Sequence, residues 1–328
     1  ALDGAREHHA ESEFVAQFQG RAALLDRDPE AAREAFARAH EIDQGDSRNL
    51  AALAECHYAL RELPKALEAA HQSLLRDCAL PAANAWMARC CAQFHRRDAG
   101  HYARAAVALA PNGWLAHLAL GEALIAGREM GEARREIDLA ASLSAERPDV
   151  VVARAIVQSI CGEEASAAEQ LEQTLADPGA LTPIAHYEAY QALCRILFGG
   201  QIFDAAMEQG RRLLEHFPDD AWAMQYAVAA ECEHLIQQGS RLEPEALAAL
   251  GERYERALEA NEAQAWIAAD YLSYLERLGG TEAAHVAVAR LREKFAESGA
   301  LVFLHGRLLR HADRGEEAAQ VMLEALVR

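Results

Sequence analysis

Apolar residues recur along most of the chain at intervals of three and four positions, which is the spacing that places them on one face of an α-helix. Polar residues fill the positions between them, so each stretch reads as an amphipathic helix. Short segments containing Gly, Pro, Asp or Asn separate these stretches and are typical of turns. The pattern predicts an all-α chain without appreciable strand content.

The amphipathic stretches also repeat at a fixed period. Three of them close on similar sequences, A-H-E-I-D-Q from Ala39, A-V-A-L-A-P from Ala106 and A-L-E-A-N-E from Ala257. Aligning these endings places repeat starts near residues 13, 47, 80, 114, 148 and 187, with a period of about 34 residues up to residue 180. Small residues then fall about two turns upstream of each ending, at Ala32, Ala66, Ala99, Ala133, Ala167 and Ala206.

In the fourth repeat, Gly121 follows a leucine, and Ala133, Ile137 and Ala140 follow at further fixed spacings. The sixth repeat carries Tyr190 in the corresponding register. This pattern resembles the tetratricopeptide repeat (TPR) family, whose repeat reads W-x2-L-G-x2-Y, then A-x3-F, then A and P. The resemblance implies a right-handed superhelical solenoid of helix-turn-helix repeats, with small residues where helices cross closely.

The resemblance covers nearly the whole chain, strictly over residues 13–180 and loosely after them, and it divides the chain into three segments. Residues 1–12 are expected to be a helical or flexible lead-in, 13–180 regular TPR-like repeats, and 181–328 degenerate TPR-like repeats with longer loops. About nine helix pairs are implied. All nine prolines fall in predicted turns, in connectors or at helix starts, where they do not break a helix; Pro183 is expected in a long loop between repeats.

Composition narrows the choice of partner. The formal charge of −19 argues against sequence-independent binding to phosphate backbones or anionic lipid, so nucleic acid is not expected as a partner. Apolar runs are interrupted before the ~20 residues that span a bilayer, so no membrane insertion is expected. The seven cysteines form no CxxC pair and indicate a reducing, cytoplasmic location. The predominance of Arg over Lys, with abundant Ala, hints at a GC-rich bacterial genome.

The resemblance also implies which residues bind, because the first helix of each TPR lines the concave surface. We expect an apolar floor from Leu118, Ile125, Val152 and Ile156, or, alternatively, burial of these residues by tighter packing. The full set of expected groove residues is Arg21, Glu55, Tyr58, Leu118, Glu122, Ile125, Ile156, Arg195 and Phe198. Glu122 and Arg195 are expected to be isolated charges on this floor.

Other chemistry has little support in the sequence. No G-x-S-x-G, phosphate-binding loop or dinucleotide fingerprint occurs, so we expect no catalytic residues, no cofactor and no metal. An Arg/His cluster runs from His95 to Arg104 and a second from His305 to Arg314. Either could receive an acidic segment or a phosphate, or simply be a solvated surface that neutralises neighbouring acids.

Together these features predict a non-enzymatic scaffold that binds a protein or peptide in its groove. An alternative is a substrate-recognition array of a larger bacterial enzyme whose catalytic domain lies outside this chain, and a third is a small-molecule or lipid site in an apolar groove. The last helix carries Ala318, Val321, Met322, Ala325 and Leu326 without a polar cap after it. A homodimer through this end is therefore possible, unless the stripe packs wholly on the preceding helix.

Overall fold

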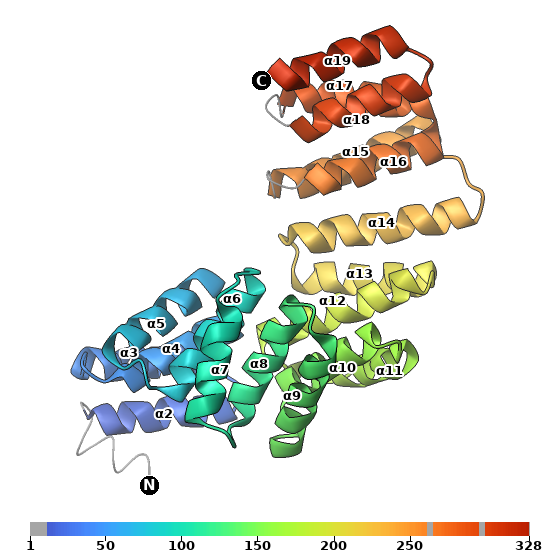
Figure 1. Cartoon of the computed structure of the whole chain (residues 1–328). Helices are drawn as coiled ribbons and strands as arrows, with labels where there is room; N and C mark the ends of the chain where they lie inside the picture. The colour runs from blue at the N-terminus through green and yellow to red at the C-terminus, as the bar shows by residue number, and fades with distance from the viewer. Residues whose placement is uncertain (1–11, 261–264, 295–298, 328) are drawn as a thin grey trace. The chain divides into compact units, whose positions relative to one another are not determined.

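A computed structural model describes residues 12–260, 265–294 and 299–327. The expected lead-in at 1–12 lies outside these ranges except for its last residue. The described residues form helices α2 to α19, with a single 3-10 turn (Pro178–Ala180) and no strand, as the hydrophobic pattern predicts. The helices follow one another as antiparallel pairs (Figure 1). The chain divides into two compact units, residues 1–196 and 197–328.

Unit 1 contains five complete helix pairs and most of a sixth first helix. Within each pair the two helices pack on each other, and α4, α6, α8 and α10 also contact one another in succession. Their bounds are α2 (Glu13–Leu25), α3 (Pro29–Ile42), α4 (Ser47–Ala59), α5 (Leu63–Arg76), α6 (Pro81–Gln93), α7 (Ala99–Leu109), α8 (Trp114–Ala126), α9 (Met130–Leu143), α10 (Pro148–Ile160), α11 (Glu164–Leu175) and α12 (Pro183–Gly199), whose last turn belongs to unit 2.

Unit 2 also consists of successive helix pairs. Its core is formed by buried residues of α14 to α18, with Tyr254, Tyr271 and Tyr274 packed as a group of rings. Its helices are α13 (Phe203–His216), α14 (Ala221–Gln237), α15 (Pro244–Ala260), α16 (Ala265–Gly279), α17 (Thr281–Lys294), α18 (Gly299–His311) and α19 (Gly315–Val327). The side chains of Ala325 and Leu326, part of the expected dimerising stripe, lie outside the described set.

The repeat positions predicted to be small are buried where helices cross. Ala32, Ala66, Ala133, Ala167 and Ala206 are all 0% exposed. Gly121 shows the need for small residues most directly, because a Cβ added there would lie 2.3 Å from Ile137 Cγ1. These contacts let the two helices of a pair approach closely enough for ridges to pack into grooves.

The helix boundaries follow local chemistry. Asp28, Asp46 and Asp220 each precede a helix and accept a hydrogen bond from a backbone N–H of its first turn. The turn inside a pair places one residue in the left-handed region, including Arg61 (φ 61°) and His95 (φ 52°). A non-glycine residue in this conformation costs about 1–2 kcal/mol.

The period of the repeats is confirmed. First helices begin at residues 13, 47, 81, 114 and 148 in the structure, within one residue of the prediction. The sixth begins at Pro183 instead of near 187, so the prediction that Pro183 lies in a loop is wrong. The reason is that proline is preorganised for the first helical position. None of the helices in the described ranges is long and apolar enough to cross a membrane.

Candidate functional site

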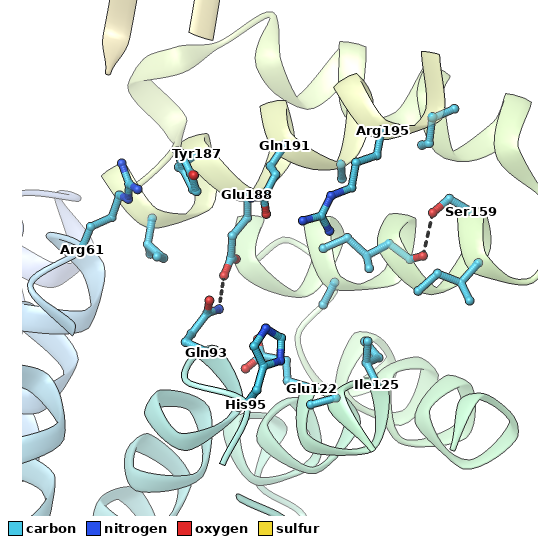
Figure 2. A pocket seen from close by; sticks show the side chains of 18 of the residues that line it. Arg61, Gln93, His95, Glu122, Ile125, Ser159, Tyr187, Glu188, Gln191 and Arg195 are labelled. Carbon is cyan, nitrogen blue, oxygen red and sulfur yellow. Dashed lines mark hydrogen bonds between the residues drawn. The ribbon is translucent and has the colours of Figure 1, made fainter. Parts of the chain in front are cut away.

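Unit 1 contains a pocket of about 610 Å³. Its lining comes mainly from first helices and the turns that follow them, which is where the TPR resemblance places a binding surface. The apolar part of the wall includes Ile125, Ala153, Ile156 and Ile184. The polar and charged lining residues are Arg61, Gln93, His95, Glu122, Ser159, Glu164, Tyr187, Glu188, Gln191 and Arg195 (Figure 2).

Helix α12 forms one wall of this pocket because it packs back onto much earlier helices of the unit. Ile184 joins the buried cluster of α6 and α8. The Arg61 guanidinium lies 3.5 Å from the centre of the Tyr187 ring, a cation–π contact. Gln93 Nε2 donates a hydrogen bond of 2.6 Å to Glu188 Oε1. The hydrogen bond joins two lining residues that are 95 positions apart in the chain.

A buried arginine organises the polar base of the site. Arg89 on α6 is 1% exposed, and its Nε and Nη2 donate to the two Glu122 carboxylate oxygens, both at 2.8 Å. Its Nη1 donates to Asp149 at 3.2 Å. The guanidinium also lies over the rings of Tyr58 and Trp86. Because a buried charge is stable only when paired and hydrogen-bonded, this cluster fixes α6, α8 and α10 to one another.

Gln93 connects this base to α12. Its Nε2 donates to Tyr58 Oη at 3.1 Å as well as to Glu188. Tyr58 is 1% exposed, so its hydroxyl requires a partner, and Gln93 supplies it. The Gln93 amide is therefore held in one orientation between α4 and α12. Glu188 itself is half-buried and points into the pocket (Figure 2).

The carboxyl groups around the site disfavour each other's ionisation. Burial raises the pKa of Glu188 to about 7, and the negative charges of Glu122 and Asp149 add to this effect, while Arg89 opposes it. Burial likewise raises the pKa of Glu122 against the attraction of Arg89. It also raises the pKa of Glu55, with Asp149 adding to the shift. Burial and the neighbouring acids thus raise the pKa of three carboxyl groups around the base of the site.

Four of the residues expected in the groove line this pocket. Ile125 and Ile156 are half-buried in its apolar wall, and Arg195 is an exposed residue that points into it. Glu122 also lines the pocket, but it is not the isolated charge that was expected, because it is the bidentate partner of Arg89. Whether these residues bind a ligand stays a prediction.

Leu118 and Val152 do not form part of an exposed apolar floor, contrary to the expectation. Both are 0% exposed, and Leu118 packs with Ile137, Ala140 and Val150 in a core between neighbouring repeats. The alternative of tighter packing therefore holds for these two positions. The physical reason is that first helices touch each other as well as their own partners, so only part of the face opposite the pair contact reaches the pocket.

The remaining expected residues do not line the pocket. Tyr58 lies beneath it as a hydrogen-bond partner of Gln93, and Glu55 is half-buried on the same helix. Arg21 is exposed on α2. Phe198 packs against Phe203 and Tyr226 within unit 2.

Arg89, Gln93 and Glu188 were not among the residues predicted from the sequence. Arg89 had a usable signal, since an arginine surrounded by Ala, Met and Cys in an apolar helix needs a buried partner. His95 was noted only as part of a basic cluster, yet it lines the pocket from the turn after α6. No cluster of three or more His, Cys, Asp or Glu in the described ranges is placed to hold a metal ion.

No protein-family model and no curated protein matches the sequence. Solved structures do match. The chain is similar to Cut9 in the APC/C hetero-tetramer Cut9-Hcn1, with a TM-score of 0.62 and 14% identity over 90% of this chain and 56% of Cut9. It is also similar to an IFIT1 monomeric mutant with Gppp-AAAA, with a TM-score of 0.58 and 14% identity over 96% of this chain and 77% of that one.

The chain therefore spans just over half the length of Cut9 and about three quarters of the IFIT1 chain. At this level of identity the similarity shows the fold and not the ligand. The fold is that of the tetratricopeptide repeat proteins, as the residue pattern predicted.

Proposed function

We propose that unit 1 binds a segment of another protein in the pocket between α6, α8, α10 and α12. The observation that carries this proposal is a cavity of about 610 Å³ in which first helices of consecutive repeats meet. A concave, partly apolar pocket with a few fixed polar groups is the usual form of a binding site. The isoleucines of its wall would hold apolar groups, and its charged groups would orient the chain.

The charge of the site supports a peptide over a phosphate-bearing ligand. The IFIT1 structure holds Gppp-AAAA, a ligand with several phosphate groups. In the present chain such a ligand would meet the carboxyl groups of Glu122 and Glu188 beside the basic side chains of Arg61 and Arg195, and a net charge of −19 overall. Repulsion between like charges in a desolvated site opposes this mode of binding.

Peptides selected from a random phage library on the unsubstituted chain test the proposal. Each selected peptide is then tested for binding to a variant in which a large side chain fills the pocket. Ala126→Trp places a large side chain at an exposed position of the lining, and Ala108→Trp places the same group on an exposed position of α7 outside it. We expect Ala126→Trp to weaken binding of the selected peptides at least about tenfold, or roughly 1.4 kcal/mol. Ala108→Trp should leave their affinity unchanged.

Circular dichroism on both variants controls for folding. Selected peptides that bind Ala126→Trp as well as the unsubstituted chain would place the binding surface elsewhere. A library that yields no enriched peptide would contradict the proposed function itself.

A further inference from the structure

The charges at the base of the pocket do not balance. Arg89 is matched by Glu122 and Asp149, and Asp149 also accepts a hydrogen bond from Arg147 Nε at 3.4 Å. Within the described part of the chain, Glu188 has a neutral hydrogen-bond partner, the Gln93 amide. A half-buried carboxylate beside two other acids, with an amide as its hydrogen-bond partner, favours the approach of a cation.

Basic groups also line the pocket. Arg61 lies over the Tyr187 ring, and His95 lies in the turn after α6. Arg195 follows Glu188 by seven residues on α12, which places their backbones about 10 Å apart along the helix. From the other packed elements, the charges of Glu122 on α8 and Asp149 on α10 act on Glu188. Glu164 on α11 also lines the pocket, and Glu55 on α4 lies near Asp149.

The apolar wall suits the rest of such a ligand. Ile125 and Ile156 are half-buried in the lining, and Ile125 stands across the pocket from α12 (Figure 2). Ile184 lies one turn before Glu188 on α12. Lysine and arginine carry their charge on an aliphatic stem that packs on apolar surface while the charged head reaches a polar partner. In this pocket the isoleucines would contact the aliphatic stem, and the carboxylate of Glu188 would contact the charged head.

We propose that the pocket receives a lysine or arginine side chain of the bound segment, with its charged head at the Glu188 carboxylate and its stem along Ile125 and Ile156. This inference rests on the proposed peptide-binding function and names the chemistry of its anchor. A pocket that recognises a peptide carboxylate would instead need basic side chains at its base.

Three probes of matched length test the anchor separately from any peptide: hexylammonium, hexanoate and hexanol. Isoleucine methyl groups are labelled for NMR, and each probe is titrated into the full chain. We expect hexylammonium to shift the methyl signals of Ile125 and Ile156 in a saturable way, while hexanoate leaves them unchanged and hexanol binds more weakly. The methyl signal of Ile137, 0% exposed in the core, serves as a check on the fold.

Glu188→Gln removes the charge and keeps an oxygen that can accept the Gln93 hydrogen bond. We expect it to weaken hexylammonium binding by about tenfold. Glu169→Gln, at an exposed position of α11 outside the pocket, is the matched control and is expected to change nothing. Tighter binding of hexanoate, an unchanged affinity in Glu188→Gln, or no hexylammonium binding would each overturn the anchor.

The pH dependence gives an independent measure. Since the pKa of Glu188 is about 7, this carboxyl is mostly protonated at pH 6 and mostly ionised at pH 8, and an alkylammonium stays protonated at both. Hexylammonium should therefore bind up to about tenfold more tightly at pH 8 than at pH 6, and Glu188→Gln should remove most of this difference. If the affinity for hexylammonium changed more with pH in Glu188→Gln than in the unsubstituted chain, Glu188 would not be the group that binds the cation.

The peptide selection separates failure of the anchor from failure of the proposed function. Peptides that are sensitive to Ala126→Trp but lack lysine and arginine, or bind Glu188→Gln with full affinity, would overturn the anchor and leave the scaffold function standing. Peptides enriched in a basic residue, with an affinity that falls in both variants, support both proposals.

Discussion

Glu188 shows how a single residue can oppose the stability of the domain that holds it. Its pKa in the folded chain is about 7, above the ordinary value of 4.5. Between these values the folded state binds a proton that the unfolded state does not, so stability falls as pH rises from about 4.5 to about 7. Above pH 7 the penalty is fully present, because a desolvated charge has then formed.

Glu188→Gln should therefore stabilise unit 1 at pH 8 and change it little at pH 5. We expect a gain on the order of 1 kcal/mol at pH 8, discounted for the partial exposure of this side chain. Urea unfolding at the two pH values, followed by tryptophan fluorescence, measures it. A loss of stability at pH 8 would mean that the Glu188 charge is favourable in the folded chain. A stabilising substitution that weakens binding is the expected mark of a residue kept for function.

At this scale the sequence identified part of the site. Ile125, Ile156, Glu122 and Arg195 line the pocket because the TPR register places them on the inner face of first helices. Glu188 and Gln93 could not be paired in this way. They meet because α12 packs back onto α6. The repeat pattern predicts contacts between adjacent repeats, but it does not predict a contact between residues 95 positions apart.

At the scale of elements, Arg89 joins three first helices through side chains alone. Its partners Glu122 and Asp149 lie 33 and 60 residues away, on α8 and α10. The side-chain exposures of 2%, 14% and 12% show that the cluster is largely shielded from water. A buried ion pair adds little net stability compared with apolar residues, but breaking it leaves an unmatched charge in the interior.

Arg89→Met should lower the free energy of unfolding by about 3–5 kcal/mol, because two carboxylates lose their guanidinium partner. Glu122→Gln should destabilise the unsubstituted chain but recover part of the loss in the Arg89→Met background, since it removes one of the unmatched charges. Thermal and urea unfolding midpoints of the four proteins complete the cycle. Additive losses would show that Arg89 and Glu122 do not act as a pair.

Helices and their pairing were the most predictable elements. The amphipathic period identifies each helix, and prolines and aspartates mark where many of them begin. Leu118 and Val152 show the limit of this reasoning. Both lie on the helix face that the repeat pattern assigns to the concave surface, yet both are buried. Leu118 packs against residues of the neighbouring first helix α10. How far that face closes depends on the packing between repeats, which the pattern of one repeat does not define.

At the scale of the whole molecule, each helix pair packs mainly on its neighbours in sequence. In such arrays stability is close to a sum of local terms, so damage in one repeat spreads only to adjacent repeats. Local opening can therefore be measured separately in the two units, by amide hydrogen exchange. This property distinguishes a solenoid from a globular domain with one cooperative core.

Ala133→Leu is a direct test of this locality. Ala133 is 0% exposed on α9, and its carbonyl oxygen would lie 3.4 Å from a Cβ at Gly121, so a larger side chain at this crossing must separate α8 from α9. Overpacking of this kind costs about 1–3 kcal/mol. We expect faster amide exchange in α8, α9 and α10 and unchanged exchange in α16 to α18. Ala108→Leu, exposed on α7, should leave both regions unchanged. Faster exchange throughout unit 2 would show that the chain unfolds as a single cooperative structure, because the strain at one crossing would then have reached helices that share no contact with it.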